Sequence, residues 1–133
     1  MPSTLLPIFL GALISGCAVD QLSLKEEVTY IAEWIGDEPV IGRRPVSVTF
    51  SDGRAYGNTG CNHWFAGYQL EGQQLRFEQA GTTRQQCAEP ISDQERRFLD
   101  ILEAVERWDV SDIDQLRLWP GEGSPLRFWP APD

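Results

Sequence analysis

The chain has 133 residues, a length typical of a single domain. Hydrophobic residues make up 41% of it and charged residues 23%, a globular composition that excludes a disordered chain. The formal net charge is −9, and the basic surface that nucleic-acid binding requires is therefore excluded. We expect an acidic surface that serves solubility or attracts cationic partners, and no nucleic-acid partner.

Residues 1–16 differ from the rest of the chain. Residues 5–14 are almost wholly apolar. This run is too short to span a bilayer, which takes about 20 residues, but it has the length of a signal-peptide core. It ends in Ile-Ser-Gly before Cys17, which resembles the lipobox of bacterial lipoproteins. We expect residues 1–16 to be a lipoprotein signal peptide and Cys17 to carry acyl chains such as palmitate. The alternatives are an ordinary secretory signal or a buried N-terminal segment.

The residue after this cysteine indicates in which membrane a lipoprotein is retained. In Gram-negative lipoproteins an Asp at that position commonly retains the protein in the inner membrane, and here the residue is Ala18. By resemblance to that rule, we expect the protein in the outer membrane, facing the periplasm. Residues 17–28 are expected to form a polar tether and residues 29–133 the folded domain.

The folded part begins with strand patterns. Residues 29–34 are rich in β-formers. Residues 46–50 alternate apolar and polar side chains, which predicts a half-buried strand. Ser-Asp-Gly at 51–53 predicts a tight turn, with residues 54–58 as the returning arm of a hairpin. Residues 63–69 are aromatic-rich and precede a further turn.

An irregular segment lies between these strands. Two glycines, Gly57 and Gly60, flank polar residues and precede Cys61 and Asn62. Such glycines predict a bulge or a close backbone approach, across which Asn62 is expected to hydrogen-bond the backbone. The segment is either a lip at the mouth of a barrel or a structural corner fixed by a disulfide.

One helix is predicted in the second half of the chain. Ser92 and Glu95 have the spacing of a capping box, in which each side chain would satisfy an amide of the first turn. An apolar stripe follows at helical spacing: Phe98, Ile101, Leu102 and Val105. Arg107 would close the helix in agreement with its dipole. We expect the stripe to cover an open face or end of a curved sheet, with the acidic residues on a solvated face.

Three short segments share one pattern. Residues 75–77, 116–118 and 126–128 each place Arg between two apolar residues, which predicts strands with the Arg outside and the apolar side chains inside. A Gly-Glu-Gly turn at 121–123 separates the last two strands as a hairpin.

The cysteines fit an exported protein. If Cys17 carries lipid, Cys61 and Cys87 remain as an even pair, and paired thiols of exported chains usually form a disulfide. The alternatives are free buried thiols, or a metal or reactive site that includes His63.

Taken in order, these motifs resemble the META domain family, which includes HslJ-like heat-shock lipoproteins of the bacterial envelope. The residues that carry the resemblance are Trp34, Gly57, Gly60, Cys61, Asn62, Thr83 and Cys87. The resemblance implies a mainly β, α+β fold: a curved antiparallel sheet or partly open β-barrel with one helix packed across it. It also implies an envelope location and, for some members, links to heat stress or to resistance to hydrophobic drugs. Cys61 and Cys87 match recurring cysteines of the family, which has no established catalytic residues.

The function expected from these observations is non-catalytic. The chain lacks a Ser-His-Asp set, a phosphate loop and a metal cluster, so we expect neither an enzyme nor a cofactor or metal. We expect a lipid-anchored binding or scaffolding protein with a role in stress or drug tolerance, whose partners are the membrane and either a hydrophobic ligand or an envelope protein. The alternative is an acidic periplasmic inhibitor that captures a cationic partner such as lysozyme.

Overall fold

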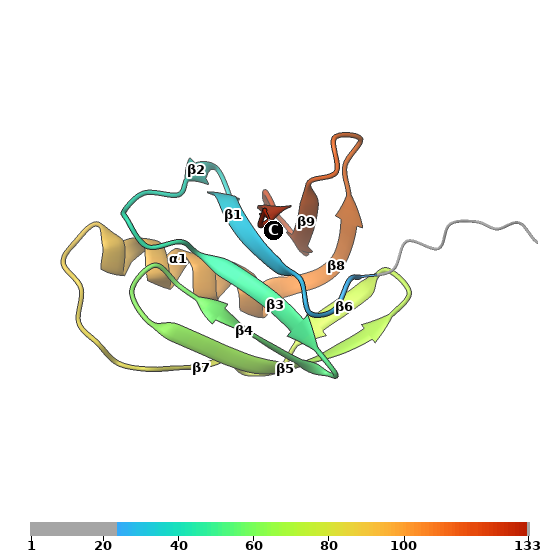
Figure 1. Cartoon of the computed structure of the whole chain (residues 1–133), viewed down its shortest axis with the longest axis horizontal. Coiled ribbons are helices and arrows are strands. Elements are labelled where there is room, and N and C mark those ends of the chain that lie inside the picture. Colours follow the sequence, from blue (N-terminus) through green and yellow to red (C-terminus); the bar gives the residue numbers. More distant parts are fainter. Residues whose placement is uncertain (1–23, 133) are drawn as a thin grey trace, which may run out of the picture.

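The computed structural model describes residues 24–132, which form ten strands and one helix (Figure 1). In chain order the elements are β1 (Thr29–Ile35), β2 (Glu38–Pro39), β3 (Ser47–Ser51), β4 (Arg54–Asn58), β5 (His63–Glu71), β6 (Gln74–Phe77), β7 (Gly81–Thr82), α1 (Ile91–Ala104), β8 (Val105–Val110), β9 (Leu116–Pro120) and β10 (Leu126–Pro130). Every strand pairing is antiparallel.

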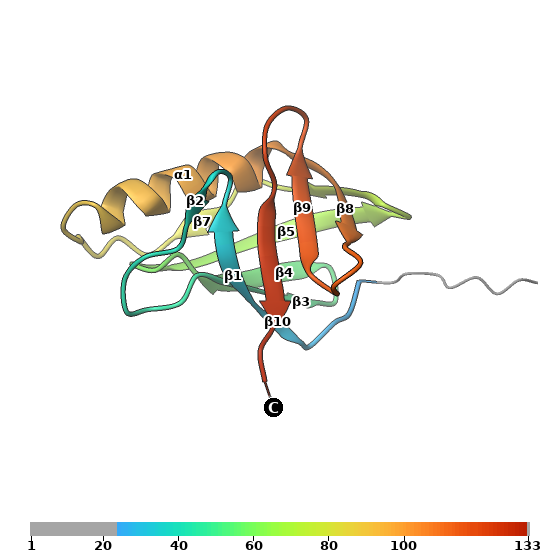
Figure 2. The same cartoon turned by 90° about the horizontal axis from the view of Figure 1, so that it is seen from above.

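The strands close into a barrel. Neighbours follow the order β1, β3, β4, β5, β6, β8, β9, β10. Strand β10 then pairs with β1, and the two lie side by side in Figure 2. The short strands β2 and β7 attach to β1 and β5. The predicted mainly β fold with one helix is confirmed. A curved sheet or a partly open barrel was expected. The barrel is instead closed, because the first and last of its strands, β1 and β10, pair with each other.

The barrel interior is filled by side chains. Phe50, Trp64, Phe98, Trp108 and Phe128 are each less than 2% exposed. The buried indole nitrogens donate hydrogen bonds to backbone carbonyls, Trp64 to Ser47 at 3.0 Å and Trp108 to Gly72 at 2.9 Å. The barrel formed by residues 24–132 therefore has an interior packed with aromatic and aliphatic side chains.

The predicted strands alternate largely as expected. In β6, β9 and β10 the Leu and Phe residues are buried. The intervening Arg76 is exposed, and Arg117 and Arg127 are half-buried. Strand β3 departs from the prediction of a half-buried strand. Its outward Ser47 and Thr49 are only 5% and 7% exposed, so this strand is covered on both faces.

Helix α1 contacts β1, β6, β9 and β10 and lies across the barrel (Figure 2). The predicted stripe is confirmed in part: Phe98 and Leu102 are fully buried and Ile101 is half-buried, whereas Val105 lies outside the helix. The predicted capping box is wrong. The helix begins at Ile91 after Pro90 with no side-chain cap, and Glu95 is turned toward the barrel instead.

The predicted end of the helix is also wrong. The backbone becomes extended at Val105, which is the first residue of β8, so Arg107 lies in a strand and not in the last helical turn. Sequence alternation did not reveal β8 because its register shifts between Val105 and Arg107.

Packing begins before the expected domain boundary at residue 29. Leu24 is 8% exposed and belongs to the core. The Glu27 amide donates to the Phe50 carbonyl at 2.8 Å, and the Asp52 amide donates to the Glu26 carboxylate at 2.7 Å. Residues 24–28 of the predicted tether are thus attached to the barrel. The predicted signal peptide and Cys17 lie outside the described residues. Within residues 24–132, the helix does not have the length and apolar character needed to cross a bilayer.

Candidate functional site

The irregular segment between β4 and β5 is a corner where two backbones meet closely. A Cβ atom on Gly57 would lie 2.0 Å from the Ser47 carbonyl oxygen, so only glycine allows this approach. Gly60 has a φ of +92°, a conformation that favours glycine. The predicted close approach is confirmed.

Thr59 shapes the turn that follows. Its hydroxyl oxygen accepts hydrogen bonds from the amides of Cys61 at 3.1 Å and Asn62 at 2.8 Å. The Thr59 amide donates to the Asn62 carbonyl at 2.8 Å. These bonds hold the chain in a compact turn and aim the Asn62 side chain inward.

Asn62 joins three segments of the chain. Its side-chain oxygen accepts from the Gln85 amide at 2.7 Å and from the Thr83 hydroxyl at 2.9 Å. Its side-chain nitrogen donates to the Gln85 carbonyl at 3.1 Å and to Glu95 Oε2 at 2.9 Å. Asn62 is 4% exposed, and its two donors and two acceptor positions are all used. The predicted bonding of this side chain to backbone is confirmed.

Glu95 ties the helix to this corner. Its Oε2 atom accepts from the Thr59 hydroxyl at 2.6 Å in addition to the Asn62 amide. The capping-box pattern did not reveal this role. The spacing of the sequence could have indicated it. Glu95 lies three residues before Phe98 and seven before Leu102, so all three lie on the same face of the helix, which is the face turned toward the barrel.

The preceding residue, Gln94, was also missed. It is fully buried, and its side chain exchanges two hydrogen bonds with the Ile41 backbone, at 2.8 and 3.2 Å. These bonds fix the loop before β3 to the helix.

The predicted disulfide between Cys61 and Cys87 is confirmed, with the two Cα atoms 6.1 Å apart. It links the corner to the segment that leads into α1. The alternatives of free thiols and of a metal or reactive cysteine are wrong, because both sulfur atoms are bonded to each other. His63 is exposed and contributes its backbone amide, which donates to the Thr83 hydroxyl at 3.1 Å. Residues 24–132 contain no group of three or more His, Cys, Asp or Glu able to hold a metal.

We call residues 59–62, 83–87 and Glu95 the clasp. Five of the seven residues that carry the family resemblance lie in it, and Gly57 lies two residues before its first segment. Trp34 lies apart, half-buried in β1, where it pairs with Pro39 and Arg127. Because the polar side chains of the clasp bond one another and its sulfurs are oxidised, its chemistry is that of a structural lock.

A groove of about 400 Å³ lies between α1 and the ends of β1 and β9. Its apolar lining includes Ile35, Ile101 and Ala104. Its carboxylates belong to Asp37, Glu38, Asp100 and Glu122. Among the described residues that line it, Arg97 is the one cation, and it is held 3.2 Å from Glu38 and 3.6 Å from Asp93. We call this surface the acidic groove.

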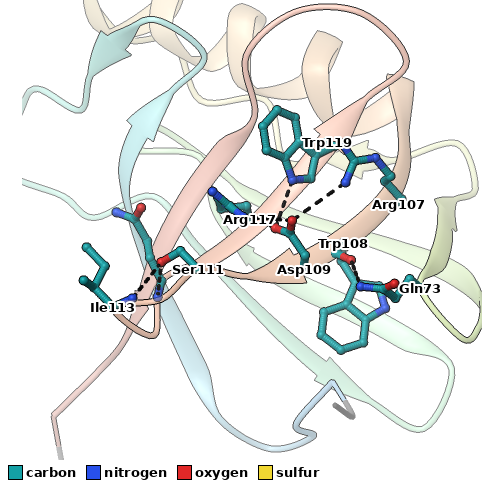
Figure 3. A network of polar contacts seen from close by, with 9 residues as sticks. Gln73, Arg107, Trp108, Asp109, Ser111, Ile113, Arg117 and Trp119 are labelled. Carbon is teal, nitrogen blue, oxygen red and sulfur yellow. Dashed lines mark hydrogen bonds and ion pairs between the residues drawn. The ribbon is translucent and has the colours of Figure 1, made fainter. Parts of the chain in front are cut away.

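A third polar cluster lies on the outside of β8 and β9 (Figure 3). Arg117 donates two hydrogen bonds to the Asp109 carboxylate, at 2.7 and 2.9 Å, and Trp119 donates a third at 3.0 Å. The Arg107 guanidinium lies 4.6 Å from the Trp119 ring centre. Partial burial alone would raise the pKa of Asp109, but the bonds from Arg117 and Trp119 and the charges of Arg117 and Arg107 outweigh it and lower that pKa below its usual value.

A closed antiparallel barrel, a disulfide-locked corner and one helix across the barrel define the structural class. The sequence matches the META domain over residues 22–133, so the chain belongs to the META domain family. Two solved structures share the fold. An NMR structure of a protein from Burkholderia xenovorans has a TM-score of 0.68 and 22% identity, covering 95% of this chain and 100% of its own. A second NMR structure has a TM-score of 0.63 and 20% identity, covering 78% of this chain and 89% of its own. A search of curated protein sequences found no similar protein.

Proposed function

We propose that this protein is a lipid-anchored member of the bacterial envelope that binds or scaffolds a partner without catalysis. The observation that supports a non-catalytic role is the saturation of the clasp. Asn62 uses all its hydrogen-bonding positions, and Cys61 is in a disulfide. The residues that mark the family therefore build the fold, and the outer surface of the barrel is left to meet a partner.

The packed interior bears on the kind of partner. A hydrophobic ligand inside the barrel would have to displace side chains such as Phe50 and Trp108, which are less than 2% exposed. Because cores of this density do not accept extra volume cheaply, we favour an envelope protein over a carried acyl chain. A role in heat or drug tolerance would follow from stabilising that partner.

The anchor is tested by replacing the acylated thiol. Cys17→Ser should move the protein from the outer-membrane fraction to the soluble periplasm, or leave it uncleaved. Ser15→Ala keeps a small residue before the cleavage site and should still be anchored. A cleaved Cys17→Ser protein that remains with the membrane would contradict the anchor.

A second function is favoured by the acidic groove. It combines an apolar lining with four carboxylates, on a chain of net charge −9. This combination suits capture of a cationic protein such as lysozyme.

Lysozyme binding measured against salt tests this second function. Capture through charge should weaken as sodium chloride rises from about 50 to about 500 mM, because salt screens exposed charges. The double variant Asp100→Asn with Glu122→Gln should weaken it further. The matched variant Glu71→Gln with Asp114→Asn removes the same charge elsewhere and should have less effect. An affinity for lysozyme that changes neither with salt nor in the groove double variant would exclude this function.

A further inference from the structure

Strands β3, β4 and β5 are neighbours in the barrel (Figure 1). A second hollow lies on their outer side. Its volume is about 460 Å³, within the range of small-molecule sites. It is separate from the acidic groove, with which it shares no lining residue among those described. We call it the aromatic hollow.

Two exposed aromatic side chains line it. Tyr56 on β4 and Phe65 on β5 are directly paired in the register of the sheet, and they are 45% and 50% exposed. Because both rings line the same hollow, they offer a ligand two apolar faces.

The pairing continues across five strands. Tyr56 is also paired with Thr49, Thr49 with Thr29, and Phe65 with Gly81. A Cβ atom on Gly81 would lie 2.6 Å from the Phe65 ring, so the ring rests against the backbone of β7. This contact fixes the orientation of the ring, and a fixed ring loses little conformational freedom when a ligand binds.

Hydroxyl groups lie beside the rings. Thr29 Oγ1 and Thr49 Oγ1 are 3.2 Å apart, and Asn58 and His63 line the same hollow. An aromatic surface is thus bordered by neutral groups that donate and accept hydrogen bonds.

The lining, as residues 24–132 form it, carries no carboxylate, ammonium or guanidinium group. That is unusual on a chain with 20 acidic and 11 basic residues. Arg54 is two residues from Tyr56 on β4 but does not line the hollow. An anion would find no cation in this part of the described surface, and a purely apolar ligand would cover hydroxyl groups without bonding them, which is unfavourable.

The ligand chemistry that satisfies these conditions is neutral, rich in hydroxyl groups and apolar on one face. A pyranose ring has this character, since its C–H groups can lie on an aromatic ring while its hydroxyls reach polar side chains. We propose that the aromatic hollow binds a neutral oligosaccharide, with Tyr56 and Phe65 as the stacking surface and Thr29, Asn58 and His63 as hydrogen-bonding partners. This site is independent of the anchor and of the acidic groove.

The test is a titration of the full chain with triacetylchitotriose and, separately, maltotriose, followed by amide chemical shifts. At least one should bind saturably with a Kd of about 1 mM or below. The largest shifts should fall in β3, β4 and β5. Affinity should be the same at about 50 and about 500 mM sodium chloride, because no charge is involved.

Variants separate stacking from folding. Tyr56→Ala and Phe65→Ala should each lower the affinity about tenfold, and Tyr56→Phe should retain most of it because the ring remains. Phe65→Leu keeps apolar bulk without the ring and should weaken binding as Phe65→Ala does. Ile113→Ala removes a side chain that is 63% exposed elsewhere and should change nothing.

The proposal would be overturned by no saturable shift with either trisaccharide, by shifts centred outside the hollow, or by affinity that survives loss of both rings. Tighter binding of an anionic oligosaccharide, or of an apolar peptide in place of both sugars, would also overturn it.

Discussion

Two networks of polar side chains hold this molecule, and they differ in what they connect. The clasp joins three segments that are distant in sequence, with Asn62 and Glu95 separated by 33 residues. The Asp109 cluster joins β8 and β9, which are already paired by their backbones at Asp109 and Arg117. The first network replaces missing backbone pairing, and the second adds to pairing that exists.

The two networks also differ in exposure. Asn62 is 4% exposed, whereas the side chains of Asp109 and Arg117 are 21% and 28% exposed. When one of its partners is removed, the buried Asn62 side chain keeps a polar atom without a hydrogen bond, while Asp109 or Arg117 left behind on β8 or β9 can bond water. Similar bonds should therefore stabilise the fold by different amounts.

The largest effect is expected for Asn62→Ala. It removes the hydrogen bonds to the Gln85 backbone and the Thr83 hydroxyl and leaves the Glu95 carboxylate with the Thr59 hydroxyl alone, and should lower the free energy of unfolding by about 4 kcal/mol. Denaturant unfolding measures this. Gln85→Ala is the matched control, because Gln85 contributes backbone groups only and its side chain is exposed. If Asn62→Ala and Gln85→Ala lowered the free energy of unfolding equally, the bonds of the Asn62 side chain would not account for the stability of the clasp.

The disulfide should rank next. Cys87→Ala should lower the free energy of unfolding by about 3 kcal/mol, from the loop entropy released by a crosslink that spans 26 residues. Cys61→Ala breaks the same bond and should give a similar loss. A loss under about 1 kcal/mol for both variants would show that hydrogen bonds hold the corner without the crosslink.

The helix contact of the clasp should contribute less. Glu95→Gln keeps the shape but weakens the bonds from Thr59 and Asn62, and we expect a loss of about 1.5 kcal/mol. Glu103→Gln changes an exposed carboxylate on the same helix and should have little effect. Thermal unfolding of both variants compares them, and a smaller shift for Glu95→Gln than for Glu103→Gln would contradict the assigned role.

The smallest effect is expected at the Asp109 cluster. Asp109→Asn should lower the free energy of unfolding by about 0.5 to 1 kcal/mol. Because the pKa of Asp109 is lowered in the folded state, its contribution is complete above the unfolded value of about 3.9 and is lost as the pH falls through the lower folded value.

The measurement is unfolding of wild type and Asp109→Asn at about pH 7 and at successively lower pH below about 3.9, over which the two proteins should converge in stability. Asp100→Asn, on the helix, is the control for loss of one carboxylate. A wild-type advantage that grows as the pH falls below about 4 would contradict a lowered pKa of Asp109 in the folded state.

Much of the fold could be predicted from the sequence because its signals are local. The alternation in residues 116–118 and 126–128 and the turn at 121–123 need only neighbouring residues to be interpreted, and the structure has them as expected. Closure of the barrel by β1 and β10 depends on pairing between the two ends of the domain, for which no local pattern exists.

The clasp was predicted in part. Its glycines and cysteines carry strong conformational and covalent preferences, so a close approach and a crosslink followed from residue type. Glu95 was misassigned because the capping-box pattern competes with a contact to Asn62 that only the tertiary fold creates. The aromatic hollow was not foreseen, since its rings come together through strand register and not through proximity in sequence.

The clasp fixes the helix to the barrel, whereas the barrel itself is held by the backbone hydrogen bonds between its strands. Amide hydrogen exchange of the oxidised and the reduced full chain tests it most directly. We predict that reduction first removes protection from α1 and residues 83–87, while β3, β4 and β5 remain protected. Simultaneous loss of protection in the helix and in these strands would contradict the claim, as would reduction that leaves the exchange of α1 unchanged.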